Sequence, residues 1–553
     1  MEEGESGMIA AAAPPPDAGG RRQLARRAGL VSAGVFASRI LGLVREQTFA
    51  VLFGAGRELD AFVTAFRIPN LMRDLFAEGA LSAAFVTTFT QRMEKDGAPA
   101  AWRLANLVVN TLAVVVGLLT LLGIWLAPAL VHFIAPGFAD IPGKTELTVE
   151  MTRVMFPFLL LVALAAVAMG VLNTCNVFGI PAAASAFFNL GSIVGGLATV
   201  AWFAPGYIES VFGGGRVAVE PNAAARAITG MAVGTLVGGL LQLLVQLPAL
   251  HRVGFRWRPT FNPSDAGLRQ VLRLMGPATV GAAAVQVNVL VNSNFASFLG
   301  DGPVSWLNVA FRFMQLPIGL FGVALGTVAL PAVSRHRARG DTAALGRTVG
   351  QALELVALLC LPAAAGLAVF GVPIIGLVYE HGRFGPTDTT LAAQALAAYA
   401  VGLAGYAGIK VLAPAFYALD DTRVPMLVSV LSIVTNFVLN WTFVRVFGFG
   451  HVGLALSTSA VAIANCVLLY VILRRRVGLL GTRAAAGFGR IVAATVIMIA
   501  AAAAVDAAVS PMLPAAATAR HALRLLVALP VSAGVLWGAA YALGIPVPRL
   551  RRR

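Results

Sequence analysis

The sequence predicts an all-α, polytopic membrane protein, and two observations carry that prediction. Of the 553 residues, 58% are hydrophobic and only 12% are charged, whereas soluble domains carry about 25% charged residues. Apolar runs of about 20 residues recur along the chain, and each is long enough to cross about 30 Å of hydrocarbon as a helix. The sequence shows no alternating pattern of the kind found in outer-membrane barrels.

We predict about 14 transmembrane helices, arranged as two six-helix lobes followed by two C-terminal helices. Their ranges are 28–53, 60–91, 104–134, 148–174, 180–203, 224–248, 266–299, 303–334, 345–378, 388–418, 424–447, 451–473, 486–508 and 522–544. The Ala-, Pro- and Gly-rich segment 1–27 is expected to be disordered. The N-lobe then covers 28–250, the C-lobe 251–475, and the last two helices with a basic C-terminus 476–553.

The net charge of +16 does not indicate a nucleic-acid partner, because the basic residues form short clusters between apolar runs. These clusters lie at 21–27, 92–103, 252–258, 335–339, 474–483 and 549–553. Cytoplasmic loops of membrane proteins carry such an excess of arginine and lysine. We therefore expect these connections and both termini to be cytoplasmic.

An internal repeat supports the two-lobe arrangement. The tripeptide "AFR" at 65–67 recurs at 310–312, an offset of 245, and Pro181 and Pro425 are separated by 244. The stretch "APGFAD" at 135–140 has a counterpart near 380–388. One shared offset indicates duplication of a six-helix unit. Because six is even, the two lobes keep the same orientation in the membrane, as in transporters with a central cavity.

Charged residues interrupt the second predicted helix, in "AFRIPNLMRDLFAEGALSAAF" at 65–85. Each charge at the bilayer centre would cost about 2.5–3.5 kcal/mol unless it faces a cavity or a partner. On a helix, one polar stripe is formed by Asn70, Asp74, Glu78 and Ser82. The first helix adds Arg39 and Arg45, and the eighth adds Arg312.

These arginines predict a cationic cavity. Pairing between neighbours, such as Arg45 with Glu46, is an alternative for a single residue but not for the set, because Arg39, Arg45, Arg73 and Arg312 outnumber the acids. Arginine suits a phosphate or pyrophosphate, since its planar fork contacts two oxygens at once.

Four stretches resemble a known family. "SRILGLVREQ" from Ser38 and "LDAFVTAFRIPNLMRDLFAEGALSAAFV" from Leu59 closely resemble the opening of the MurJ (MviN) family, the lipid II flippases of the MOP exporter superfamily. "GPVSWLNVAFRFMQLPIGLFGVALGTVALP" and "YAVGLAGYAGIKVLAPAFYALDDTRVP" resemble its later signatures. The resemblance covers about 25–545. It implies fourteen helices, two lobes and a hydrophobic groove framed by the last two helices.

The resemblance also implies residue roles. The family's cavity arginines fall on Arg39, Arg45, Arg73 and Arg312, its second-span acid on Glu78, and further family positions on Asp60, Asn70 and Ser305. Where some members carry acids beside the eighth-span arginine, this chain has Phe311 and Gln315. Arg312 is therefore expected to be less neutralised than in those members.

Some members bind sodium in the C-lobe through carboxylates, and here the equivalent positions are uncharged. The candidates are Asn288 or Asn292, Asn436 and Asn440, with Ser457 or Thr458. Neutral amides bind a hard cation weakly, so interhelical hydrogen bonding is the favoured alternative. Lys410 either extends to the interface or supplies a counter-charge, and both interpretations stay open. We expect no metal site and no cofactor.

The function implied is transport, not catalysis: lipid II would be moved from the cytoplasmic to the periplasmic leaflet of a bacterial inner membrane. The expected partners are lipid II and membrane lipids. Whether the cell-wall synthesis machinery is also a partner stays open. Two alternatives are another exporter of the same superfamily and a non-transporting scaffold for cell-wall synthesis. A drug exporter for cations would need an acidic cavity, which this sequence lacks, and a scaffold would need no cavity charges.

Overall fold

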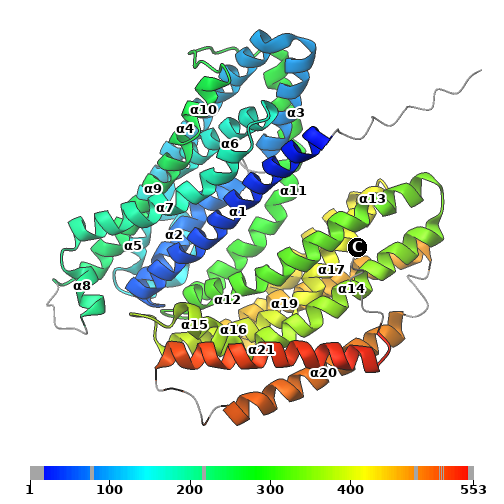
Figure 1. The fold of residues 1–553 in the computed structure, drawn as a ribbon. Helices are drawn as coiled ribbons and strands as arrows, with labels where there is room; N and C mark the ends of the chain where they lie inside the picture. Colours follow the sequence, from blue (N-terminus) through cyan, green and yellow to red (C-terminus); the bar gives the residue numbers. More distant parts are fainter. Residues whose placement is uncertain are drawn as a thin grey trace, which may run out of the picture.

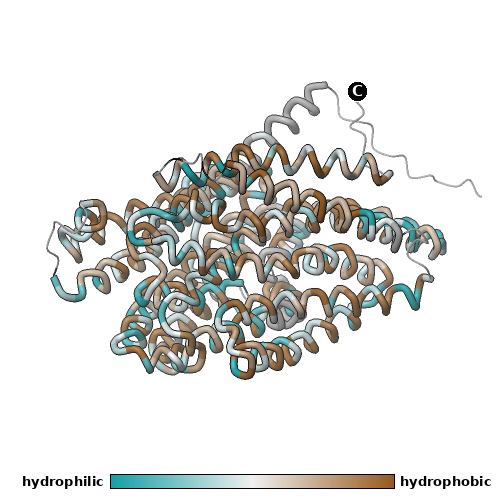
Figure 2. Tube along the Cα trace, turned by 90° about the horizontal axis from the view of Figure 1, so that it is seen from below, coloured by the Kyte–Doolittle hydropathy of each residue, from teal (hydrophilic) through white to brown (hydrophobic). Residues whose placement is uncertain are grey.

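The computed structural model is a bundle of long helices, and it describes residues 18–74, 80–213, 220–478, 484–509, 511, 514 and 516–545. No strand occurs in these ranges. Apolar residues extend along most of the helical length (Figure 2). The prediction of an all-α membrane fold is confirmed.

The chain divides into three groups of helices. The N-lobe contains α1 (Ala18–Phe53), α2 (Arg57–Arg73), α3 (Ala80–Lys95), α4 (Gly97–Ile134), η2 (Pro136–Asp140), α5 (Lys144–Met155), α6 (Phe158–Thr174), α7 (Gly179–Phe203), α8 (Tyr207–Phe212), α9 (Ala223–Leu244) and α10 (Leu247–Arg252). The C-lobe contains α11 (Ala266–Ser297), α12 (Pro303–Pro317), η3 (Ile318–Val323), α13 (Ala324–Ala338), α14 (Thr342–Val369), α15 (Gly371–Tyr379), α16 (Pro386–Val401), α17 (Leu403–Ala418), α18 (Arg423–Asn440), η4 (Trp441–Val446) and α19 (Gly450–Val477). A final pair consists of α20 (Ala484–Val509) and α21 (Ala517–Ala542).

Ten spans of the described chain are long and apolar enough to cross a membrane, or eleven if the bent pair α16–α17 counts as one. Helices also lie in the three remaining predicted ranges: α1 in the first, α2 and α3 in 60–73 and 80–91 of the second, and α11 in the third. Helix α2 has 17 residues and α3 has 16, so each alone is shorter than the roughly 20 residues that a membrane span needs.

Helices α7 and α9 form the most closely packed pair of the N-lobe. A Cβ atom added to Gly234 would lie 2.3 Å from Gly196 Cα, and one added to Gly191 would lie 2.9 Å from Gly238 Cα. Small residues let helix backbones approach in this way in membrane proteins. Helix α1 packs in turn against α7, so the glycine contact supports the helix that carries Arg39 and Arg45.

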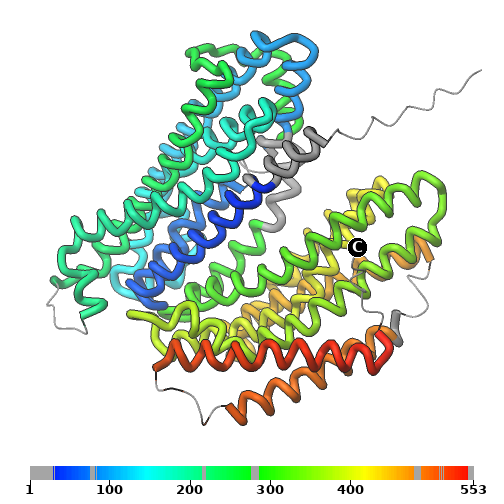
Figure 3. The backbone as a smooth tube through the Cα atoms, in the orientation of Figure 1, coloured from blue at the N-terminus to red at the C-terminus, as the bar shows by residue number. Residues whose placement is uncertain are grey.

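The two lobes meet at one end and diverge toward the other (Figure 3). Helix α11 passes between them, with its first half against α3 and α4 and its later part against α18 (Figure 1). At the end where the lobes meet, Arg383 N donates to Val51 O at 2.9 Å, and Gln47 Nε2 donates to Val378 O at 2.7 Å. Gly382 is required there, because its φ is +58° and an added Cβ would lie 2.4 Å from Val51 O. We call this region the closed end.

The C-terminal pair packs on the C-lobe, with α20 against α14 and α21 against α15. In Figure 1 it lies along the side of the C-lobe that faces away from the N-lobe. The buried His521 ring rests against Gly376 of α15, and its Nε2 lies 3.3 Å from a Glu380 carboxylate oxygen. The predicted lipid groove of this pair stays a prediction.

Candidate functional site

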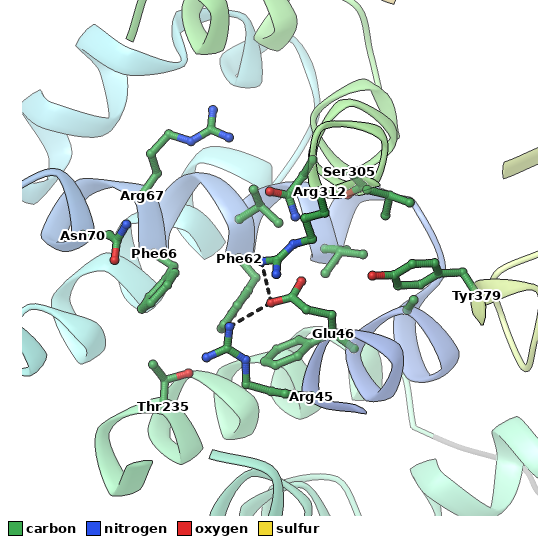
Figure 4. Close-up of a pocket in the computed structure, with 16 residues that line it drawn as sticks. Arg45, Glu46, Phe62, Phe66, Arg67, Asn70, Thr235, Ser305, Arg312 and Tyr379 are labelled. Atoms are coloured by element: carbon green, nitrogen blue, oxygen red, sulfur yellow. Dashed lines mark hydrogen bonds and ion pairs between the residues drawn. The ribbon is translucent and has the colours of Figure 1, made fainter. Parts of the chain in front are cut away.

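A cavity of about 160 Å³ lies between the lobes. Helices α1, α2 and α9 supply its N-lobe wall, and α12 and α15 supply its C-lobe wall (Figure 4). Its lining consists of Arg45, Glu46, Phe49, Ala50, Leu59, Phe62, Val63, Phe66, Arg67, Asn70, Thr235, Ser305, Asn308, Val309, Arg312 and Tyr379. We call this cavity the arginine pocket.

Spacing along the helices explains why these side chains share one pocket. The lining residues of α12 recur every three or four positions, from Ser305 through Asn308 to Arg312. Those of α2 recur in the same way, from Leu59 to Asn70. Residues with this spacing lie on one face of a helix.

One carboxylate oxygen is shared by two arginines from different lobes. Glu46 Oε1 lies 2.8 Å from Arg45 Nη2 and 2.7 Å from Arg312 Nη2, as the dashed lines in Figure 4 show. The Arg45 guanidinium also lies 5.1 Å from the Phe188 ring centroid. Its Nε is buried and has no hydrogen-bond partner among the described residues. The ion pair with Glu46 therefore leaves the Arg45 Nε–H group without an acceptor in the part of the pocket that the structure describes.

Arg67 is the third cation of the pocket, and its Nη1 donates a hydrogen bond to Ser293 Oγ of α11. No ion pair with a carboxylate is found for it within the described part of the chain. The lining residues thus hold three arginines and one acid, which leaves two positive charges in excess. Arg67 and Arg312 are the two arginines of the repeated "AFR" tripeptide.

Two of the predicted cavity arginines, Arg39 and Arg73, do not line this pocket. Arg39 is exposed on α1, with no ion pair in the described ranges. Arg73, at the end of α2, lies 2.9 Å from an Asp74 oxygen. Glu78 lies outside the described residues. Asn70 does line the pocket, and its buried Oδ1 has no partner among the described residues.

Asp60 joins the two lobes at the closed end. Its side chain is completely buried. Oδ1 accepts hydrogen bonds from Ser305 N at 2.8 Å and Ser305 Oγ at 2.7 Å, and Oδ2 accepts one from Gly302 N at 2.7 Å. These donors form the first turn of α12, where a carboxylate is stabilised by the free N–H groups and the helix dipole. Asp60 of the N-lobe therefore connects the two lobes through hydrogen bonds to the C-lobe.

Lys144 completes this contact, although its position in a loop gave no reason to single it out. Its fully buried ammonium lies 3.2 Å from Asp60 Oδ2, 2.8 Å from Asp301 Oδ1 and 4.2 Å from the Phe138 ring centroid. We call Asp60, Lys144, Asp301, Gly302 and Ser305 the interlobe latch. Nearby, burial raises the pKa of Tyr207 to about 12, and its hydroxyl donates to Leu52 O.

The amides of the C-lobe form a hydrogen-bonded network across α11, α18 and α19. Asn292 Oδ1 accepts from Asn436 Nδ2 at 3.0 Å and from Asn440 Nδ2 at 2.8 Å. Asn292 Nδ2 donates to Thr458 Oγ1 at 3.1 Å, and Ser457 Oγ donates to the Asn440 amide oxygen. A neighbouring bond joins Asn288 to Ser432. The amide oxygens of Asn292 and Asn440 thus already accept hydrogen bonds.

Lys410 is exposed on α17 and makes no ion pair within the described ranges. The sequence reasoning also did not select Arg67, Glu46 and Tyr379 as pocket residues. For Arg67 a signal was present, since the repeat pairs it with Arg312. Tyr379 gave no signal, because only the packing of α15 brings it to the pocket.

Comparison with known proteins identifies the family. A family model described as lipid II flippase MurJ matches residues 49–527. A lipid II flippase MurJ of Burkholderia cenocepacia is 37% identical over 450 residues, covering 81% of this chain and 83% of that protein. A solved structure of lipid II flippase MurJ in an inward closed conformation has a TM-score of 0.72 at 24% identity, covering 93% of this chain and 99% of its own.

A more distant structure has the same fold. An inward-facing multidrug resistance MATE transporter of the MOP superfamily has a TM-score of 0.62 at 16% identity, with 80% of this chain and 95% of that chain covered. The family model covers most of the chain, from the end of α1 into α21. The chain therefore belongs to the MurJ family of lipid II flippases.

Proposed function

We propose that this protein moves lipid II from the cytoplasmic to the periplasmic leaflet of the bacterial inner membrane by alternating access. In this proposal Arg45, Arg67 and Arg312 bind the pyrophosphate. The observation that carries the proposal is the convergence of three guanidinium groups from both lobes on one pocket with a single carboxylate.

The charge balance of the arginine pocket suits a pyrophosphate. Its lining has two positive charges in excess, and a charge held away from bulk water is stabilised by an opposite charge nearby. A guanidinium fork can donate two hydrogen bonds to phosphate oxygens. The unsatisfied Arg45 Nε supplies a further donor. The same excess disfavours a cationic drug.

Glu46 occupies the place between Arg45 and Arg312 that a phosphate oxygen would take. In the empty pocket its carboxylate separates two like charges, with contacts of 2.8 and 2.7 Å. Incoming pyrophosphate would compete with it for the same donors. On binding, Arg312 would exchange its contact with Glu46 for a contact with the substrate. Because Arg312 belongs to the C-lobe, the position of that lobe would then depend on whether the pocket is occupied.

The size of the pocket limits what it holds. At about 160 Å³ it is smaller than typical ligand pockets of about 300–1,000 Å³. We infer that it receives the pyrophosphate alone. The sugar and peptide would then lie in the diverging space between the lobes, and the polyprenyl tail would lie in lipid or along α20 and α21.

Opening to the other side would require the interlobe latch to separate. If the basic connections are cytoplasmic, as the charge distribution predicts, the closed end is periplasmic and the present conformation faces inward. Reporter fusions test this orientation. Fusions at Arg337 and Arg476 should report a cytoplasmic location, and fusions at Gly137 and Gly382 a periplasmic one. The reverse result at Arg337 would overturn the orientation.

The function itself is tested by labelling lipid II at the outer face of cells depleted of this protein. Wild-type protein should restore labelling, and Arg45→Ala, Arg67→Ala and Arg312→Ala should not, at equal protein level. Arg153→Ala is the matched control, because Arg153 is an exposed arginine outside the pocket. Normal labelling with all three pocket variants would contradict the proposed mechanism.

A further inference from the structure

A basic and aromatic segment on the N-lobe, residues 252–261, begins with the last residue of α10 and continues toward α11. None of its residues lines the arginine pocket. The segment is held rigidly along α4 by two asparagines one turn apart. Asn106 Nδ2 donates to Arg256 O at 3.0 Å, and Asn106 Oδ1 accepts from Arg258 N at 2.7 Å. Asn110 Nδ2 donates to Arg258 O at 2.8 Å and to Thr260 O at 2.9 Å.

This attachment leaves two aromatic rings uncovered. The Trp257 side chain is 63% exposed, and its indole N–H donates to Asn110 Oδ1 at 3.0 Å. The Phe261 side chain is 59% exposed. By contrast, Phe255 packs against Trp102 with ring centroids 6.2 Å apart. One ring therefore fixes the segment to the protein, while two face outward.

The segment also presents three arginines without acidic partners. Arg252, Arg256 and Arg258 are all exposed, and no ion pair is found for them within the described residues. The carboxylates of Asp96 and Asp265 face Arg92 instead, at 3.4 and 3.9 Å. The surface is therefore strongly positive and lacks an internal counter-charge.

The position along α4 places this surface at the membrane boundary. Exposed apolar side chains on α4 begin at Val114 and continue to Phe133, a stretch of about 30 Å on a helix, which matches the hydrocarbon core. Asn110 precedes that band by one turn, about 6 Å. Trp257 thus lies at headgroup depth, where tryptophan is enriched in membrane proteins.

We propose that residues 252–261 form a docking surface for anionic phospholipid headgroups, in which the three arginines contact phosphates and the Trp257 and Phe261 rings enter the interface. The segment leads directly into α11, the helix that passes between the lobes. Docked lipid would therefore hold this end of the N-lobe at a fixed depth. Each arginine near an anionic surface contributes about a five-fold gain in affinity, so the three together give about 100-fold.

The test uses the full-length protein, with Cys175, Cys360 and Cys466 replaced by alanine, in nanodiscs of phosphatidylcholine and phosphatidylglycerol. A fluorophore on Ser264→Cys reports contact with either lipid when that lipid carries a headgroup quencher. We expect phosphatidylglycerol to be enriched around the label. The variant Arg252→Gln/Arg256→Gln/Arg258→Gln should lose the enrichment, and added salt should weaken it.

The matched control is Arg335→Gln/Arg337→Gln/Arg339→Gln, which removes the same charge from the C-lobe and should leave the enrichment unchanged. If the first triple variant fails to insert, Arg258→Gln and Asn110→Ala should each lower the enrichment. If phosphatidylglycerol were not enriched around the label in the wild type, the proposal would be overturned. An acidic protein partner would then be the alternative occupant of this surface. If both triple variants lost the enrichment equally, the enrichment would depend only on the net charge of the protein. That result would overturn the proposal as well.

Discussion

Equivalent helix pairs in the two lobes are held together by different means. In the N-lobe, α7 and α9 approach backbone to backbone through glycines such as Gly196 and Gly234. In the C-lobe, the corresponding α18 and α19 are joined through side chains, by hydrogen bonds between Ser457 and the amides of Asn436 and Asn440. Both are known ways of packing helices where lipid supplies no hydrophobic driving force.

The same contrast appears at the lobe interface. Helix α1 carries Arg45 and Glu46, whereas α11, which occupies the corresponding place, carries Asn292 and Ser293. Only the second helix of each lobe keeps its arginine, as Arg67 and Arg312. The two lobes thus share the arginine of the second helix, and the N-lobe adds Arg45 and Glu46 at the interface.

The largest effect is expected where the lobes are joined, at Asp60. Asp60→Asn should destabilise the closed end, because removing one partner of a buried ion pair costs about 3–5 kcal/mol. Ser297 is a suitable reporter position, because it is buried at this end and its hydroxyl accepts a hydrogen bond from Gly137 N of the other lobe at 3.1 Å. A cysteine in place of Ser297, in a protein without its native cysteines, should then react faster with a membrane-impermeant maleimide. Lys144→Met in the same chain should restore part of the protection.

The control for this experiment is Asp140→Asn, an exposed acid on η2 at the same end. It should leave the reaction rate unchanged. If Asp60→Asn also left the rate unchanged, the latch would not hold the lobes together.

The second effect concerns the repeated arginines. Arg67→Ala and Arg312→Ala should each weaken lipid II binding by about 1.5–3 kcal/mol, because each removes charge-assisted hydrogen bonds. This corresponds to about 10- to 150-fold in affinity. Lysine at either position should restore only part of the loss, since it lacks the planar fork. If Arg312→Ala weakened lipid II binding and Arg67→Ala did not, the two arginines would not play equivalent roles.

The third effect tests the glycine packing of the N-lobe. Gly234→Ala should lower stability by about 1–3 kcal/mol, the cost of overpacking a close contact, because the added Cβ meets the backbone of Gly196. Thermal unfolding in detergent measures it. Gly117→Ala on α4 has open space around the new methyl group and should be neutral or slightly stabilising. Similar melting temperatures for the two variants would show that the contact is not tight.

The smallest effect is expected in the amide network of the C-lobe. Asn292→Ala should lower stability by about 0.6–1.7 kcal/mol, as measured for hydrogen bonds between membrane helices. Replacing sodium by potassium should change neither the melting temperature nor transport, because the network contains no carboxylate. Loss of transport without sodium, at constant membrane potential, would show that these amides bind the ion.

The sequence predicted the all-α membrane fold, because apolar runs report directly on membrane spans. The expectation of disorder through residue 27 was wrong at its end, since α1 begins at Ala18. Family membership also confirms the expectation of a transporter instead of an enzyme. The residues of the site were harder to predict from the sequence. Asp60 and Lys144 are 84 positions apart, and no local periodicity indicates that they meet. Arg45 and Arg312 were selected as charged residues within predicted membrane helices, and the resemblance implied the same positions, whereas Arg67 could have been selected from the repeat.

The central claim is that arginines from both lobes hold the pyrophosphate of lipid II together. Equilibrium binding of lipid II to the purified Arg67→Ala/Arg312→Ala protein, compared with undecaprenyl phosphate as a ligand with one phosphate, tests it most directly. The wild type should bind the diphosphate more tightly than the monophosphate, and the double variant should lose this preference. A double variant that keeps the wild-type preference for the diphosphate would contradict the account.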